Sequence, residues 1–111
     1  MVKIVMSIVV KNIFAPVAGI GTEEEFVTLL ENSALKIERI VSHSHASPEG
    51  FWYDQAEDEW VIVLRGEANL KFASGEQVEL GEGDYLTIPR HLKHRVRRTG
   101  PDTIWLAVYL K

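Results

Sequence analysis

Apolar and polar residues alternate with a period of two over most of the chain beyond residue 35. Residues 67–72 alternate most cleanly, so Ala68, Leu70 and Phe72 share one face of a predicted strand. Residues 60–64 form a continuous apolar run, which predicts a strand covered on both faces. Gly, Pro and Asp turns bound further predicted strands at 36–42, 77–80, 85–88, 94–98 and 103–110.

The first ten residues are almost entirely apolar. The run is short, carries one leading lysine and is followed at once by Lys11 and Asn12, so it predicts a β-strand rather than a signal peptide. No other apolar stretch approaches the length that spans a membrane. We therefore expect a cytoplasmic protein. Residues 13–21 hold a proline and two glycines and predict a loop.

Between this loop and the strands that follow, the spacing of the apolar residues is that of a helix. Thr22 precedes three glutamates, as an N-cap precedes an acidic first turn. Phe26, Leu29 and Leu30 then follow at helical spacing. This pattern predicts one short helix that ends near Asn32 and packs on the outside of the sheet.

The whole pattern predicts a single all-β domain over residues 1–111. About eight or nine short strands with tight turns are typical of a small antiparallel β-barrel or jelly roll. The barrel is expected over about residues 36–110, and the N-terminal strand, loop and short helix over 1–35. An immunoglobulin-like sandwich is the structural alternative, but the chain has no cysteine for its disulfide.

The amino-acid composition limits which metal ligands and which partners the chain can have. Without cysteine, any metal must be held by nitrogen and oxygen ligands. The net charge of −4 argues against nucleic acid as the main partner. Five basic residues do cluster within 90–98, either as the solvated face of a strand or as a positive rim for an anionic substrate.

Two segments carry the candidate chemistry. Glu59 lies on a predicted strand that ends at Gly66, and His94 follows a Gly-Asp turn at Gly83 and a proline at Pro89. If the two segments face each other across one barrel, a carboxylate and an imidazole converge in its interior. These are two of the usual parts of a divalent-metal site.

At these residues the chain resembles the cupin superfamily over about residues 36–110. The spacing from Glu59 to Gly66 matches the end of the first cupin motif, and that of Gly83, Pro89 and His94 matches the second. His91 stands where the second motif usually has a glycine, and Arg98 where it has a terminal asparagine. More narrowly, residues 47–55 resemble those of small bacterial single-domain cupins of undefined activity. The resemblance implies a double-stranded β-helix that binds a metal.

The first motif departs from the family pattern. A typical cupin has His-x-His shortly before the glutamate, whereas Tyr53 and Gln55 stand at those positions here. In one model the metal ligands are Gln55, Glu59 and His94, with Tyr53 as a further ligand or a hydrogen-bonding neighbour. In the other model, residues 46–58 are an insertion and His43 and His45 supply the imidazoles. These mixed ligands suit Fe(II), Mn(II) or Ni(II), and zinc is also compatible.

The resemblance implies a metal-dependent enzyme of dioxygenase, isomerase or decarboxylase type acting on a small polar molecule. Tyr53, or one of the histidines His43, His45 and His91 near the barrel mouth, would be the catalytic proton carrier. A non-catalytic ligand-binding or sensor protein with a degenerate metal site is the alternative. His91 is a spare ligand, a general base or a surface residue. We expect a small-molecule ligand, no nucleic-acid or membrane partner, and a homodimer in which residues 4–10 add to a neighbour's sheet.

Overall fold

The computed structural model describes residues 2–5, 7–16 and 23–111, and all of its strand pairs are antiparallel. One sheet has the order β3-β4-β10-β5-β8 and the other the order β7-β6-β9. The strands of the first are β3 (Glu25–Glu31), β4 (Leu35–Ser42), β10 (Thr103–Leu110), β5 (Asp58–Arg65) and β8 (Tyr85–Ile88). Those of the second are β7 (Gln77–Leu80), β6 (Ala68–Phe72) and β9 (His94–Thr99).

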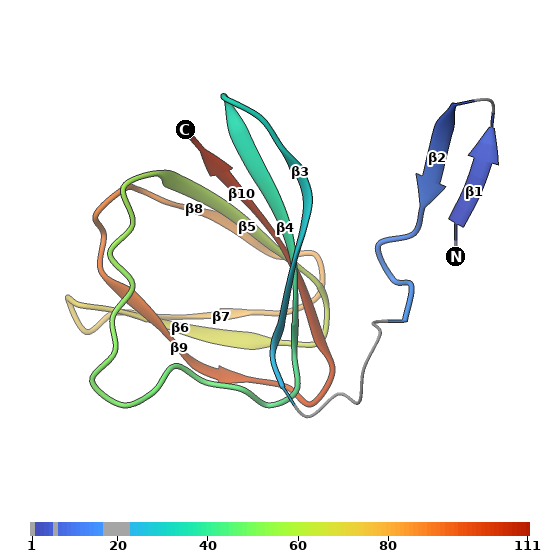
Figure 1. The fold of residues 1–111 in the computed structure, drawn as a ribbon. Helices are drawn as coiled ribbons and strands as arrows, with labels where there is room; N and C mark the ends of the chain where they lie inside the picture. Colours follow the sequence, from blue (N-terminus) through green and yellow to red (C-terminus); the bar gives the residue numbers. More distant parts are fainter. Residues whose placement is uncertain (1, 6, 17–22) are drawn as a thin grey trace.

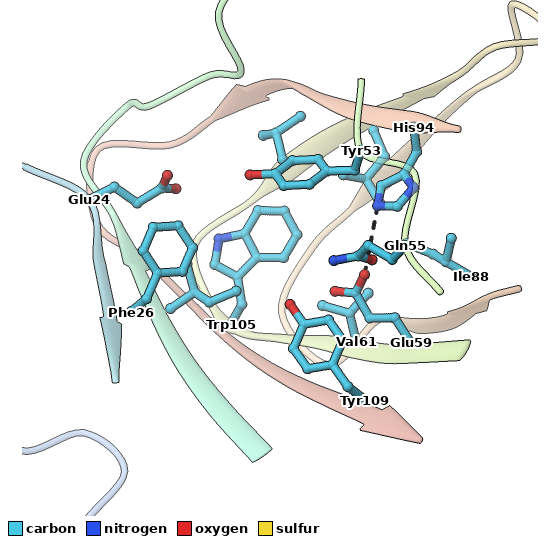
Figure 2. Close-up of a pocket in the computed structure, with 13 residues that line it drawn as sticks. Glu24, Phe26, Tyr53, Gln55, Glu59, Val61, Ile88, His94, Trp105 and Tyr109 are labelled. Atoms are coloured by element: carbon cyan, nitrogen blue, oxygen red, sulfur yellow. Dashed lines mark ion pairs between the residues drawn. The ribbon is translucent and has the colours of Figure 1, made fainter. Parts of the chain in front are cut away.

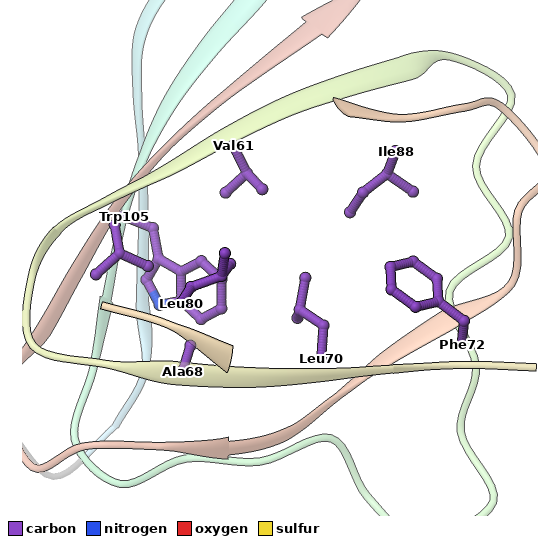
Figure 3. Close-up of a cluster of buried hydrophobic side chains, with 8 residues drawn as sticks. Val61, Ala68, Leu70, Phe72, Leu80, Ile88 and Trp105 are labelled. Carbon is purple, nitrogen blue, oxygen red and sulfur yellow. The ribbon is translucent and has the colours of Figure 1, made fainter. Parts of the chain in front are cut away.

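The two sheets face each other, and the core lies between them (Figures 1 and 3). Their hydrogen-bond ladders are separate rather than joined into one closed ring. The predicted all-β jelly-roll architecture is therefore confirmed, as two facing sheets. The buried cluster consists of apolar side chains from both sheets: Val61, Val63, Ala68, Leu70, Phe72, Leu80, Ile88 and Trp105.

Strand β5 is covered on one face only, which corrects the prediction from its continuous apolar run. Val61 and Val63 point into the core and are 2% and 0% exposed. Trp60, Ile62 and Leu64 alternate with them and are only half-buried. The run is uniformly apolar, but no further layer of the described chain fully covers the outer face of this sheet.

The predicted short N-terminal helix is wrong, because residues 25–31 form strand β3. This strand pairs with β4 in the register Phe26↔Ile40, and the register shifts between Thr28 and Leu30. Three apolar residues at helical spacing span barely one turn, and hydrogen bonding to an adjacent strand outweighs so weak a local preference. No residue within 2–5, 7–16 and 23–111 is helical. Thr22, the predicted N-cap, lies outside the described residues.

The N-terminal apolar run forms two strands instead of one. Strands β1 (Val2–Val5) and β2 (Ile8–Lys11) make a hairpin that is not paired with either larger sheet (Figure 1). The predicted loop that follows is irregular over residues 13–16, and its residues 17–21 lie outside the described part. Arg39 of β4 ties this loop to the sheet by donating from Nη1 to the carbonyls of Ile13 (3.0 Å) and Ala15 (3.1 Å).

The turn between β5 and β6 depends on Gly66, the glycine of the first motif. Its φ is +88°, in the region that favours glycine. A Cβ at this position would lie 2.6 Å from Thr103 Oγ1 and 2.8 Å from the Asp102 carbonyl oxygen. The close approach of the turn to the start of β10 explains why a glycine is needed there.

Across the same described residues, no helix is long and apolar enough to cross a bilayer.

Candidate metal and ligand pocket

A pocket of about 70 Å³ opens between the two sheets. Tyr53, Gln55, Glu59 and His94 all line it, so the structure brings together the four residues of the first model. Figure 2 shows the Gln55 amide beside the line that joins His94 to Glu59. Their role as metal ligands stays a prediction.

Backbone hydrogen bonds hold the loop of Tyr53 and Gln55 against the second motif. Tyr53 N donates to the His94 carbonyl (2.7 Å), and His94 N donates to the Tyr53 carbonyl (3.1 Å). His91 N donates to the Gln55 carbonyl (2.7 Å). These bonds fix the position of the loop relative to β9, and they explain how residues far apart in sequence reach one pocket.

His91 supports this loop from outside the pocket. Its φ of +62° lies in the left-handed region, where the family pattern has glycine. Its ring Nδ1 lies 2.8 Å from Asp54 Oδ1, and the side chain is 64% exposed. His91 therefore positions the loop next to Gln55 and does not line the pocket.

His94 begins β9 and presents one ring nitrogen to Glu59. Its Nδ1 donates to the Leu92 carbonyl (2.8 Å), which can only accept, so the neutral ring keeps its lone pair on Nε2. Nε2 lies 3.7 Å from Glu59 Oε1, and the His94 side chain is 6% exposed. Burial acts to lower the pKa of His94, but the Glu59 carboxylate and the Leu92 carbonyl outweigh it and raise that pKa overall.

Glu59 is a buried carboxylate with an unsatisfied oxygen. The residue is 7% exposed, and its Oε1 has no hydrogen-bond partner. It lies on β5 opposite Ile88 of β8 and Tyr109 of β10. A buried carboxylate is costly to the fold unless a cation or a hydrogen-bond donor lies beside it.

Tyr53 stacks on His94, with ring centroids 5.4 Å apart and planes 23° from parallel. Burial raises the pKa of the Tyr53 phenol, and the carboxylates of Glu24, Glu59 and Glu38 raise it further. The phenol therefore keeps its proton at neutral pH, which suits a proton donor better than an anionic ligand.

Sequence reasoning missed three further pocket residues. Glu24 falls within the predicted helix, and the sequence pattern predicts no site role for Trp105 or Tyr109, yet all three line the pocket. Burial raises the pKa of Tyr109, as do Glu59 and Glu38. The alternation of Trp105, Ala107 and Tyr109 along β10 was a usable signal, because these residues share one face with period two.

The other histidines and the basic cluster lie elsewhere. His43 and His45 do not line the pocket, and His43 Nδ1 lies 3.6 Å from Asp102 Oδ1. None of the five basic residues in 90–98 lines it either. Arg98, for example, pairs with Glu67 (2.8 Å) and Glu79 (2.9 Å), as expected for a solvated strand face.

The donor set is mixed. Within the described ranges, no three His, Cys, Asp or Glu side chains lie close enough together to hold a metal. One imidazole nitrogen and one carboxylate face each other here, and an amide and a phenol are the next donors. The unsatisfied oxygen of Glu59 and the free Nε2 lone pair fit a divalent cation, though with fewer strong ligands than three histidines and a carboxylate would supply.

Residues 37–109 match the model of the cupin domain family. None of the curated proteins compared with the chain matches it. A crystal structure from Ralstonia eutropha, named a "putative mannose-6-phosphate isomerase", is 43% identical with a TM-score of 0.83, covering 91% of this chain and 96% of its own.

More distant structures share the fold alone. A cupin superfamily protein from Desulfitobacterium hafniense is 17% identical, with a TM-score of 0.72 and coverage of 85% of this chain and 83% of its own. An RmlC-like cupin from Methanocaldococcus jannaschii, described as a double-stranded β-helix, is 16% identical, with a TM-score of 0.68 and coverage of 79% and 80%. The family match, the two facing sheets and the two motifs agree: the chain belongs to the cupin family.

Proposed function

We propose that this small cupin binds a divalent metal ion between its sheets through Gln55, Glu59 and His94. The observation that carries the proposal is the buried Glu59 carboxylate, whose Oε1 lacks a partner and faces His94 Nε2 at 3.7 Å. Fe(II), Mn(II) or Ni(II) suit these ligands, and zinc is compatible. A neutral amide is a weaker ligand than imidazole, so we expect moderate affinity.

The second part of the proposal is metal-dependent catalysis on a small polar molecule. A bound metal would act as a Lewis acid that polarises an oxygen of the substrate. Tyr53 keeps its proton and lines the same pocket, so it is the candidate proton donor. The name of the Ralstonia protein favours isomerase chemistry, but one fold supports many reactions.

A non-catalytic ligand-binding protein is the alternative. The pocket walls are mainly apolar and aromatic, which favours binding of a small molecule by burial. Such a protein would retain its ligand when the metal ligands are changed, whereas a metal-dependent enzyme would lose turnover and metal together.

Metal stoichiometry tests the proposal. Purified wild type, His94→Ala and the double variant His43→Ala/His45→Ala are incubated with Mn(II), dialysed, and analysed for bound metal. Near-stoichiometric metal in the wild type and the double variant, with loss in His94→Ala, supports the site. The double variant is a matched control, because it removes two histidines outside the pocket. Metal lost from both, or absent from the wild type with Fe, Mn, Ni and Zn alike, contradicts the site.

The proposal also includes a homodimer, in which the hairpin β1–β2 of one copy pairs with β3 of the other. Strand β3 is an edge strand with one unpaired side, and its Phe26, Leu29 and Leu30 are 44–52% exposed. Ile8 and Val9 of the hairpin are 65% and 48% exposed. A recess of about 610 Å³ separates β2 from β3, and a strand of a second copy would fill it.

Light scattering on a sizing column tests this assembly. We expect a mass of about twice 12.6 kDa for the wild type. Leu29→Lys should yield monomers, because a charged side chain on an edge strand opposes pairing. Tyr85→Lys is the control, since Tyr85 is 64% exposed on β8 at the opposite edge of the same sheet. A monomeric wild type, or equal effects of the two variants, contradicts this arrangement.

A further inference from the structure

The pocket has a second acidic end that the proposed metal ligands do not use. Glu24 lines it on the side away from Glu59 and His94, next to Phe26 and the indole of Trp105 (Figure 2). Ser42 Oγ donates to Glu24 Oε2 at 2.6 Å, and Trp105 Nε1 donates to Ser42 Oγ at 3.2 Å. This chain of hydrogen bonds holds the Glu24 carboxylate in place with its charge available to the pocket.

The charge in the pocket is negative. None of the 13 residues shown to line it is lysine or arginine, whereas Glu24 and Glu59 lie at its two ends. Glu38 is also near, but Lys36 lies 3.6 Å from it and offsets its charge. An anion such as a sugar phosphate finds no lysine or arginine side chain here.

The walls at the Glu24 end are aromatic. Phe26, Tyr53 and Trp105 line this part of the pocket, and Phe26 is 52% exposed at its opening. Aromatic faces next to a carboxylate attract ammonium groups, and methylated ammonium ions gain most because they are weakly hydrated. Independently, the buried Glu59 oxygen has no hydrogen-bond partner, so a positive or hydrogen-donating group in the pocket would be favourable.

The size of the pocket limits the ligand. A water molecule needs roughly 10–15 Å³ of cavity, so 70 Å³ holds roughly five to seven non-hydrogen atoms. This is room for a methylated ammonium group with a short polar arm that extends towards His94.

We propose that the pocket binds a small organic cation, with its ammonium group between Glu24 and the aromatic faces and an oxygen donor directed to the Glu59–His94 end. The second half rests on the proposed function, since the oxygen would meet the metal held there. The first half rests on Glu24 and the aromatic walls alone. Glu24 and Phe26 are then specificity-determining residues.

Calorimetric titration with three probes tests the inference. The probes are choline, its uncharged carbon isostere 3,3-dimethyl-1-butanol, and mannose 6-phosphate, each added to protein with and without Mn(II). We expect choline to bind at least about fivefold more tightly than either other probe. Equal binding of choline and its isostere, or tighter binding of mannose 6-phosphate, overturns the inference.

Matched variants locate the effect. Glu24→Gln keeps an acceptor for Ser42 but removes the charge, and we expect a loss of about fivefold or more in choline affinity. Glu23→Gln is the control, because Glu23 is exposed and does not line the pocket. Unchanged choline affinity in Glu24→Gln, or an equal loss in Glu23→Gln, overturns the inference.

The metal content of the same samples separates the two proposals. If the wild type takes up Mn(II) but does not bind choline, the organic-cation inference fails and the metal site stands. If choline binds selectively without any metal uptake, the inference stands at its Glu24 end and the metal proposal fails. Glu24→Gln should retain Mn(II), because Glu24 lies outside the proposed ligand set.

Discussion

Replacing Glu59 by glutamine keeps the shape of a buried side chain and removes its charge. In the metal-free protein, Glu59 Oε1 has no hydrogen-bond partner, and the neighbouring Nε2 of neutral His94 is itself an acceptor. The glutamine amide can donate to that nitrogen. We therefore expect Glu59→Gln to stabilise the metal-free protein at a pH above the pKa of His94.

The magnitude follows from the burial. An unsatisfied buried polar group costs about 1–3 kcal/mol, and a charged one costs more. Glu59 is 7% exposed, so little of this cost is relieved by water. The free energy of unfolding should rise by about 1–3 kcal/mol, with an increase in Tm of about 4 °C per kcal/mol for a domain of this size.

Metal should reverse the order of stability. A metal present at 1,000 times its Kd stabilises the folded wild type by about 4 kcal/mol. Glu59→Gln lacks the anionic ligand and should gain much less. The wild type should thus be the less stable protein in EDTA and the more stable one in excess Mn(II).

Urea unfolding followed by tryptophan fluorescence measures both states. Glu76→Gln is the control, because Glu76 is exposed on the turn after β6 and should change stability by less than about 0.5 kcal/mol. The reasoning would be refuted if the metal-free wild type were more stable than Glu59→Gln by about 1 kcal/mol or more, a difference that a buried hydrogen bond to a charged group can provide. Glu59 would then be satisfied within the protein and would not be awaiting a ligand.

Three other predictions follow from the structure. Gly66→Ala should cost at least about 2 kcal/mol more in unfolding free energy than Gly75→Ala: both glycines have positive φ, but only Gly66 has Thr103 and Asp102 atoms against its added Cβ; equal costs would contradict the close approach. Leu70→Ala should cost about 2–5 kcal/mol and enlarge the pocket, since Leu70 is 2% exposed and lines it; a crystal structure of the variant and its urea curve check both, and a collapsed pocket would count against this. The raised pKa of His94 stabilises the metal-free fold fully below the unfolded pKa of about 6.5, and that contribution disappears as the pH rises through the folded pKa; a stability difference between wild type and His94→Gln in EDTA that does not shrink from pH 5 to 9 would exclude it.

Much of the two-sheet fold was predictable, because its strands alternate and end at strong turn residues. Strands β7, β8 and β10 begin and end where the pattern predicted. Strand β3 was not predictable, because Phe26, Leu29 and Leu30 fit one turn of helix as well as they fit a bulged strand. Only the pairing of residues 25–31 with β4 decides between a helical turn and a strand, and a pairing between separate segments cannot be read from the local pattern.

The candidate pocket was predictable in part. Motif spacing pointed to Glu59 and His94, and counting back along the chain reached Tyr53 and Gln55. Glu24 was out of reach, because its place in the pocket depends on β3 being a strand at the sheet edge. The position of the loop before β5 also depends on backbone bonds to His91 and His94, which carry no mark in the side-chain pattern.

Backbone groups form part of the contact between the scaffold and the loop that carries Tyr53 and Gln55: an isolated bridge joins Tyr53 to His94, and His91 N donates to the Gln55 carbonyl. Backbone bonds survive a change of side chain, so the donor atom at position 55 can be exchanged while the hydrogen bond from His91 N is kept. Evolution can therefore change the side-chain donor groups that line this pocket while the two sheets stay the same. If Gln55 is a metal ligand as proposed, Gln55→His would replace a weak ligand by a strong one in a single substitution.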